Sequence, residues 1–81
     1  MSAEDVRKAM LKLMDALSGE IIRTEAMAEE LTWAAVALSG QQRGAEAIRD
    51  TAVRKRVQAL ELRGQLAALC DECANRFPLK L

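Results

Sequence analysis

The stretch that decides the fold runs from Ala45 to Ala74 and has the sequence AEAIRDTAVRKRVQALELRGQLAALCDECA. Apolar residues recur along it every three or four positions, the spacing that places them on one side of an α-helix. This first strip consists of Ala45, Ile48, Ala52, Ala59, Leu62, Leu66, Leu69 and Cys73, with Lys55 as the one polar residue in register. The pattern predicts a long amphipathic helix over residues 45–75.

The same stretch carries a second apolar strip, which lies about 150° around the helix from the first at 100° per residue. Its members are Val53, Val57, Leu60, Gly64, Ala67 and Ala74. A helix in a two-helix hairpin needs only one apolar strip. The second strip therefore predicts a contact with another chain, either a second copy or a different protein.

The N-terminal half of the chain predicts another long helix, over residues 4–38. Ser2 followed by Asp5 is a helix start signal. Gly19 lies in the helix interior, where glycine costs about 1 kcal/mol relative to alanine. We expect one helix, and the alternative is a break at Gly19 that gives three helices in all. The apolar strip of this helix consists of Val6, Met10, Leu13, Leu17, Ile21, Ala28, Leu31, Ala35 and Leu38.

Residues 39–44 supply the predicted turn. Gly40 is suited to a left-handed helix cap, and Ser39 with Gln42 to a capping box at the start of the second helix. A turn there lets apolar positions face each other along both helices, for example Ala35 with Ile48, which favours an antiparallel hairpin. Pro78 ends the second helix, and residues 76–81 form a C-terminal tail.

The length of the chain limits what it can bury on its own. Its 81 residues form one domain, and so short a chain has a marginal core. Trp33 and Phe77 are the only aromatic residues, and a composition of mainly alanine and leucine favours close-packed helices over a sheet. We therefore predict an all-α antiparallel helical hairpin that self-associates, most simply as a homodimer that forms a four-helix bundle.

The net charge is zero, but the two halves of the chain differ. Residues 1–40 hold four basic and seven acidic side chains, a balance of −3, and residues 41–81 hold eight basic and five acidic, a balance of +3. This asymmetry predicts attraction between the antiparallel helices or between copies, with Arg63 lying near Glu20.

The residue inventory speaks against catalysis. The sequence contains no histidine and no tyrosine, and no glycine-rich loop follows a strand. We predict that the protein is not an enzyme and holds no cofactor. Glu4 and Asp5 stand where a signal peptide would be basic, and no apolar run approaches the roughly 20 residues of a membrane span. We therefore expect a cytoplasmic protein without membrane contact.

Cys70 and Cys73, with two residues between them, have the spacing of half a zinc site. The segment from Cys70 to Pro78 resembles the start of the zinc finger in the DksA/TraR family. That family needs a second cysteine pair, which this chain lacks, so we predict no metal site within one chain. The favoured interpretation is that both cysteines are small buried residues at the helix end. The alternative is a zinc-linked oligomer in which two copies share Cys70 and Cys73.

Arg49, Arg56 and Arg63 are seven residues apart and form a line along one side of the second helix, which could contact phosphates or an acidic partner. Small dimeric helical hairpins that bind RNA, the Rop proteins, provide a precedent, and residues 69–77 are similar to a Rop C-terminal helix. The resemblance implies a nucleic-acid-binding hairpin dimer as the alternative function. Zero net charge and the lack of interleaved aromatic residues favour pairing of these arginines with acidic side chains instead.

The favoured function is protein binding. Trp33 is predicted to face away from the contact between the helices, on a partial second strip of the first helix, and an exposed tryptophan is a good binding anchor. The predicted partner-binding residues are Ile22, Trp33, Val36, Val53, Val57 and Leu60. We expect a small adaptor, chaperone-like or inhibitory protein of bacterial or phage type that forms a homodimer and binds another protein.

Overall fold

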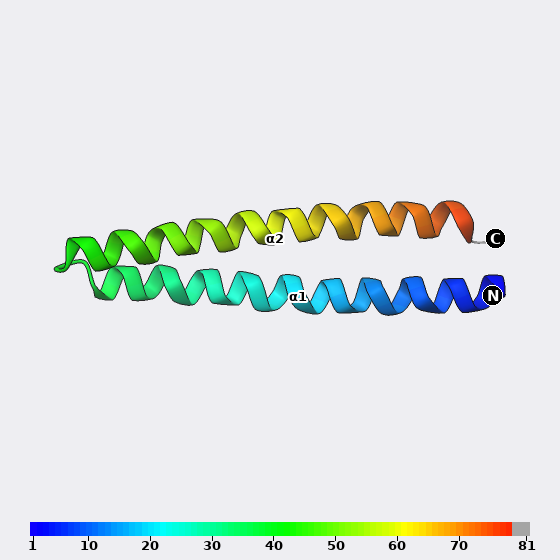
Figure 1. The fold of residues 1–81 in the computed structure, drawn as a ribbon, viewed down its shortest axis with the longest axis horizontal. Helices are drawn as coiled ribbons and strands as arrows, with labels where there is room; N and C mark the ends of the chain where they lie inside the picture. Colours follow the sequence, from blue (N-terminus) through cyan, green and yellow to red (C-terminus); the bar gives the residue numbers. More distant parts are fainter. Residues whose placement is uncertain (79–81) are drawn as a thin grey trace.

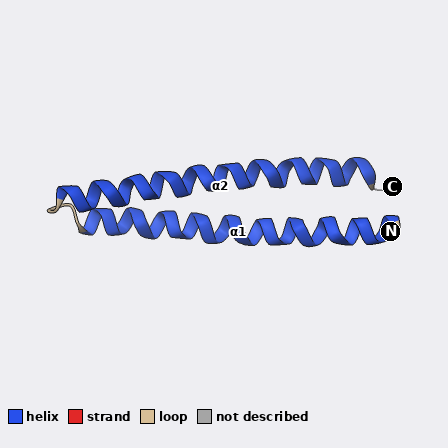
Figure 2. Ribbon diagram, in the orientation of Figure 1, coloured by secondary structure: helices blue, strands red, loops and turns tan. Residues whose placement is uncertain are grey.

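The computed structural model describes residues 1–78, which form two long α-helices joined by a short turn (Figure 1). Helix α1 spans Ala3–Ala37 and α2 spans Gln42–Arg76. The helices lie antiparallel, with the start of α1 and the end of α2 at one end and the turn at the other. Figure 2 shows only helix and loop in the described part of the chain. The predicted all-α helical hairpin is confirmed.

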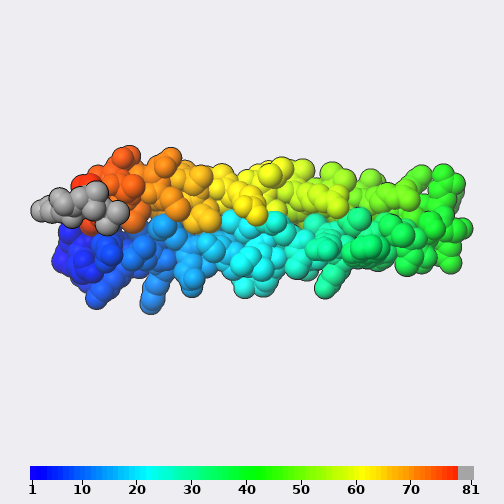
Figure 3. All heavy atoms as spheres, turned by 180° about the vertical axis from the view of Figure 1, so that it is seen from behind, coloured from blue at the N-terminus to red at the C-terminus, as the bar shows by residue number. Residues whose placement is uncertain are grey.

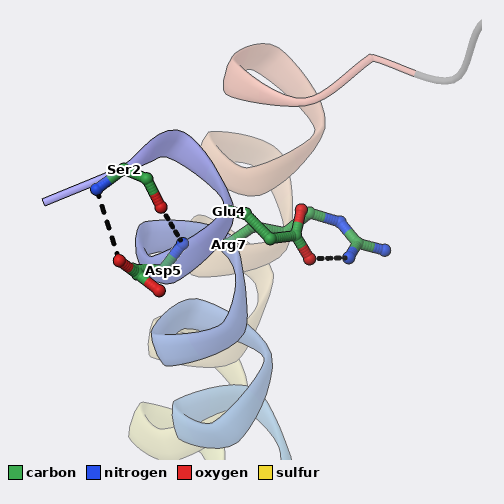
Figure 4. A network of polar contacts seen from close by, with 4 residues as sticks. All are labelled: Ser2, Glu4, Asp5 and Arg7. Atoms are coloured by element: carbon green, nitrogen blue, oxygen red, sulfur yellow. Dashed lines mark hydrogen bonds and ion pairs between the residues drawn. The ribbon is translucent and has the colours of Figure 1, made fainter.

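The start of α1 is fixed by a capping box (Figure 4). The backbone N–H of Asp5 donates to Ser2 Oγ at 3.1 Å, and the Ser2 N–H donates to the Asp5 carboxylate at 3.4 Å. These bonds satisfy backbone donors that have no partner within the helix. Glu4, in the same first turn, forms an ion pair with Arg7 at 3.2 Å. The start signal in the sequence is thus confirmed, and the helix begins one residue earlier than predicted.

Helix α1 continues through Gly19, so the alternative of three helices is wrong. The Ser18 hydroxyl donates to the Met14 carbonyl one turn earlier at 2.9 Å, so the backbone of the same helix supplies its hydrogen-bond partner. Ile21, directly after the glycine, is buried between the helices. Packing of the apolar side against α2 therefore outweighs the low helix propensity of one glycine.

The turn is shorter than predicted. It spans residues 38–41, and the Gln41 N–H donates to the Leu38 carbonyl at 2.8 Å. No glycine among the described residues has a positive φ, so the left-handed cap at Gly40 is wrong. The capping box of Ser39 with Gln42 is also wrong, because Gln41 is the N-cap of α2 and its side chain makes no capping bond. Gly44 lies in the first turn of α2, where backbone N–H groups lack helical partners in any case.

The short turn brings the end of α1 and the start of α2 together. The last residue of α1 is Ala37 and the first of α2 is Gln42, and Ala35 and Ala45 lie within three residues of them. These two alanines are among the most buried residues of the structure.

Buried residues lie along the contact between the two helices, which we call the seam. Five of them are alanines, and small side chains let two helices approach closely. In the view of Figure 1 the ribbons lie closer together at the turn end than at the termini. The buried residues are Ile21, Thr24, Ala28, Ala35, Ala45, Ala52 and Ala59. Towards the termini the seam side chains are larger and only half-buried: Val6, Met10, Met14, Leu17, Leu62, Leu66, Leu69 and Cys73.

The predicted seam is wrong at one position of α1. Leu13 is 51% exposed, and Met14 takes its place between the helices. From Met10 to Leu38 the seam then alternates steps of four and three residues without interruption. Because Leu13 and Met14 are adjacent and both apolar, helical spacing alone did not decide between them. The eight apolar residues predicted for the seam of α2 are all buried or half-buried, as expected.

Helix α2 ends at Arg76, one residue beyond the prediction. The Phe77 N–H donates to the Cys73 carbonyl at 2.9 Å, and Pro78 follows outside the helix. Of the predicted tail, residues 79–81 lie outside the described residues. The whole is an elongated rod with extents of 58 × 21 × 15 Å (Figure 3). Neither helix has the length of apolar, uncharged sequence that a membrane crossing needs.

Candidate protein interaction surface

The six residues predicted to bind a partner all face solvent. Three lie on α1 and three on α2, and between 48% and 69% of each is exposed. They are Ile22, Trp33, Val36, Val53, Val57 and Leu60. Their position outside the seam is therefore confirmed. That they bind a partner stays a prediction.

Trp33 and Leu60 border one face of the hairpin, from opposite helices. A shallow depression of about 380 Å³ is lined by Glu25, Ala28, Glu29, Thr32, Trp33 and Arg56. A second is lined by Glu25, Arg56, Ala59, Leu60 and Arg63. The two depressions share Glu25 and Arg56, so they adjoin. We call this continuous surface from Trp33 to Leu60 the Trp33–Leu60 face.

Two polar links between the helices form the centre of this face. Arg63 Nη2 donates to Glu25 Oε1 at 2.5 Å, and Arg56 Nη2 donates to Thr32 Oγ1 at 2.6 Å. The Thr32 hydroxyl in turn donates to the Ala28 carbonyl at 2.9 Å. Because both arginines and both acceptors are seven residues apart, the links repeat after two helical turns. Sequence reasoning missed these partners, although the shared seven-residue spacing was a visible signal.

The arginine line is thus partly engaged within the chain. Arg56 and Arg63 both extend across to α1, but only Arg63 pairs with an acidic side chain, as predicted, whereas Arg56 donates to the Thr32 hydroxyl. The predicted partner of Arg63 is wrong, because Glu20 binds Arg23 at 2.9 Å on its own helix. Arg63 instead binds Glu25, which lies five residues nearer the turn than Glu20. Arg49 is exposed and lies nearer to the turn.

The opposite face of the hairpin is more polar. Its depression is lined by Glu20, Arg23, Thr24, Met27, Lys55 and Gln58. Lys55 is half-buried, and its ammonium group donates to Gln58 Oε1 at 3.4 Å. Leu13 precedes Met27 by fourteen residues, a whole number of heptads, so it lies on the same side. Leu13 and Met27 are thus exposed apolar residues that lie away from the Trp33–Leu60 face.

The two cysteines differ in exposure. Cys73 is half-buried on the seam, in agreement with its predicted packing role, whereas Cys70 is exposed, so the expectation that both are buried is wrong for Cys70. Both are free thiols. Within residues 1–78 no cluster of three or more histidine, cysteine, aspartate or glutamate side chains has the geometry to hold a metal ion.

Comparisons with models of protein families, with curated proteins and with solved structures find no match to this chain.

Proposed function

We propose that this protein is a non-enzymatic protein–protein interaction module that works as a homodimer, in which two hairpins form a four-helix bundle. The observation that carries the proposal is the excess of exposed surface. The chain exposes 6281 Å². A folded monomer of 8.9 kDa is expected to expose about 4,800 Å². About 1,500 Å² per chain is therefore available to be covered by other chains.

The composition of the core supports the same proposal. Within residues 1–78, Ile21 is the only large apolar side chain that is fully buried. The buried alanines contribute one methyl group each, about 0.8 kcal/mol when buried. Larger seam residues such as Leu62, Leu66 and Leu69 are only partly buried. A second copy would cover the exposed apolar strips and would supply stabilisation that the isolated hairpin lacks.

The exposed tryptophan supports a role in binding a further protein. Trp33 is 67% exposed beside the polar centre of the Trp33–Leu60 face. Large aromatic side chains at the centre of an interface contribute much of its binding energy. An apolar surface left uncovered in the dimer would suit an adaptor, a chaperone-like protein or an inhibitor, each of which acts by covering part of another protein.

The proposal is tested by sedimentation velocity over a range of protein concentrations. We expect the wild type to sediment as a dimer and the double variant Trp33→Ala with Leu60→Asp as a monomer, because a carboxylate in the apolar contact would lose its hydration. The matched control, Leu13→Asp with Met27→Ala, changes two apolar residues of the opposite face and should remain a dimer. A wild type that is monomeric at every concentration, and that captures no protein, would refute the proposal.

A further inference from the structure

We infer that two copies associate through α2, with the strip of one copy packed antiparallel on the same strip of the other. This inference rests on the proposed self-association and assigns its surface. The strip consists of Val53, Val57, Leu60, Gly64 and Ala67, and we call it the α2 strip. All five residues are exposed in the hairpin.

The α2 strip is apolar without interruption. Its members alternate steps of four and three residues, the spacing by which two helices pack side by side over several turns. The corresponding strip of α1 has the same spacing, but Glu29 occupies its middle, between Ala26 and Trp33. Self-packing of the α1 strip about its centre would bring two Glu29 carboxylates together. The α2 strip is therefore the better surface for a second copy.

The side-chain sizes favour an antiparallel arrangement. Val53, Val57 and Leu60 are bulky, whereas Gly64 and Ala67 are small. If Val57 faces Leu60 of the second copy, then Val53 faces Gly64 of that copy, since both pairs of numbers sum to 117. Bulky side chains then meet small ones at both ends of the contact. A parallel arrangement would place valine on valine and glycine on glycine, which fills space less evenly.

Gly64 has no explanation within the hairpin. It lies in the interior of α2, where glycine costs about 1 kcal/mol relative to alanine. A Cβ atom at this position would meet nothing within 4 Å, so no contact of the chain itself requires glycine. Close approach of another helix would require a small residue there. Gly64 therefore supports a helix of the second copy at this point of the strip.

Charges beside the strip agree with the same register. Arg54 and Glu61 lie on one flank, seven residues apart, which is too far for a pair within one helix. Neither forms an ion pair within residues 1–78, and the Arg54 side chain donates to the Asp50 carbonyl at 3.4 Å. In the antiparallel arrangement Arg54 of each copy lies beside Glu61 of the other. On the other flank Arg56 and Arg63 are turned towards α1, away from the contact.

The resulting assembly is a flattened four-helix bundle. Because the α2 strip lies about 150° around the helix from the seam, α2 would stand between α1 and the α2 helix of the second copy. A standard interface covers about 800 Å² on each partner. The excess of about 1,500 Å² is enough for this contact and leaves apolar surface, including Trp33, on the outer helix α1.

The same substitution, leucine to aspartate, made separately at two positions tests this assignment. We expect Leu60→Asp to raise the dissociation constant of the dimer at least 100-fold in analytical ultracentrifugation, and Leu13→Asp to change it less than threefold. A dimeric wild type that Leu60→Asp leaves unchanged would overturn the assigned contact while the proposed self-association stands. A monomeric wild type would refute both.

Cross-linking of the folded protein covers the case in which Leu60→Asp unfolds. Cys70→Ser with Cys73→Ser removes the two natural thiols, and Leu60→Cys or Leu13→Cys is then added. A short bifunctional maleimide should join two copies of the Leu60→Cys protein covalently and leave the Leu13→Cys protein uncrosslinked. Circular dichroism of both variants checks that they remain helical. Equal yields of covalent dimer, or linkage only at Leu13→Cys, would overturn the inference.

Discussion

Arg56 and Arg63 show how much of a side chain's contacts can be predicted from the sequence. Their charge indicated pairing with the acidic half of the chain, and Arg63 indeed binds a glutamate of α1. The identity of the partner depends on how far a long arginine side chain extends along the neighbouring helix, which helical spacing does not determine. Arg63 binds Glu25, whereas Glu20 binds Arg23 on its own helix. Sequence alone predicts the sign of such a contact more securely than its partner.

The capping box at Ser2 allows a test at the same scale. We expect Ser2→Ala to lower the free energy of unfolding by about 1 kcal/mol, because the Asp5 N–H loses its acceptor. Urea unfolding followed by circular dichroism measures the change. Ser39→Ala is the matched control, since Ser39 was predicted to cap α2 and does not, and it should change stability by less than about 0.5 kcal/mol. Equal losses for the two variants would contradict the assigned caps.

The helices themselves were largely predictable. Apolar spacing identified both, and the eight apolar seam residues of α2 match the structure. Two errors remained at the level of elements. Glycine signals suggested a turn over 39–44, but Gly44 fits the first turn of α2, so the helix begins at Gln42. In α1, Met14 rather than Leu13 lies on the seam, because adjacent apolar residues leave the helical phase ambiguous near the N terminus.

The continuity of α1 predicts the effect of a substitution at Gly19. We expect Gly19→Ala to raise the free energy of unfolding by about 1 kcal/mol, since alanine is the better helix former. The new Cβ would lie 3.3 Å from Arg23 Nη1, the far end of a flexible side chain that can move aside. Thermal and urea unfolding measure the change. A loss of stability would indicate that the helix is interrupted at Gly19 after all.

At the scale of the whole molecule, the candidate surface was predictable as a set of residues but not as a face. Helical phase placed Ile22, Trp33 and Leu60 outside the seam, and all three are exposed. That Trp33 and Leu60 border one continuous face depends on how the two helices lie side by side, which no single helix reveals. The polar links at the centre of that face depend on the register in the same way.

Self-association should also couple stability to protein concentration. Only folded chains associate into the dimer. We therefore expect the midpoint of thermal unfolding to rise as the protein concentration increases from micromolar to millimolar. Differential scanning calorimetry at several concentrations measures this. The Leu60→Asp variant, as a monomer, should unfold at a midpoint that does not depend on concentration. A wild-type midpoint that stays constant would argue against association linked to folding.

Native mass spectrometry of the full chain, purified without chelator, is the direct test of self-association through apolar helix surfaces. It reports the number of subunits and any bound metal in one spectrum. We expect a dimer that carries no metal and is held together by apolar contacts between helices. A monomer would contradict self-association, and a dimer that carries zinc and dissociates when the zinc is removed would contradict the apolar contact as its cause.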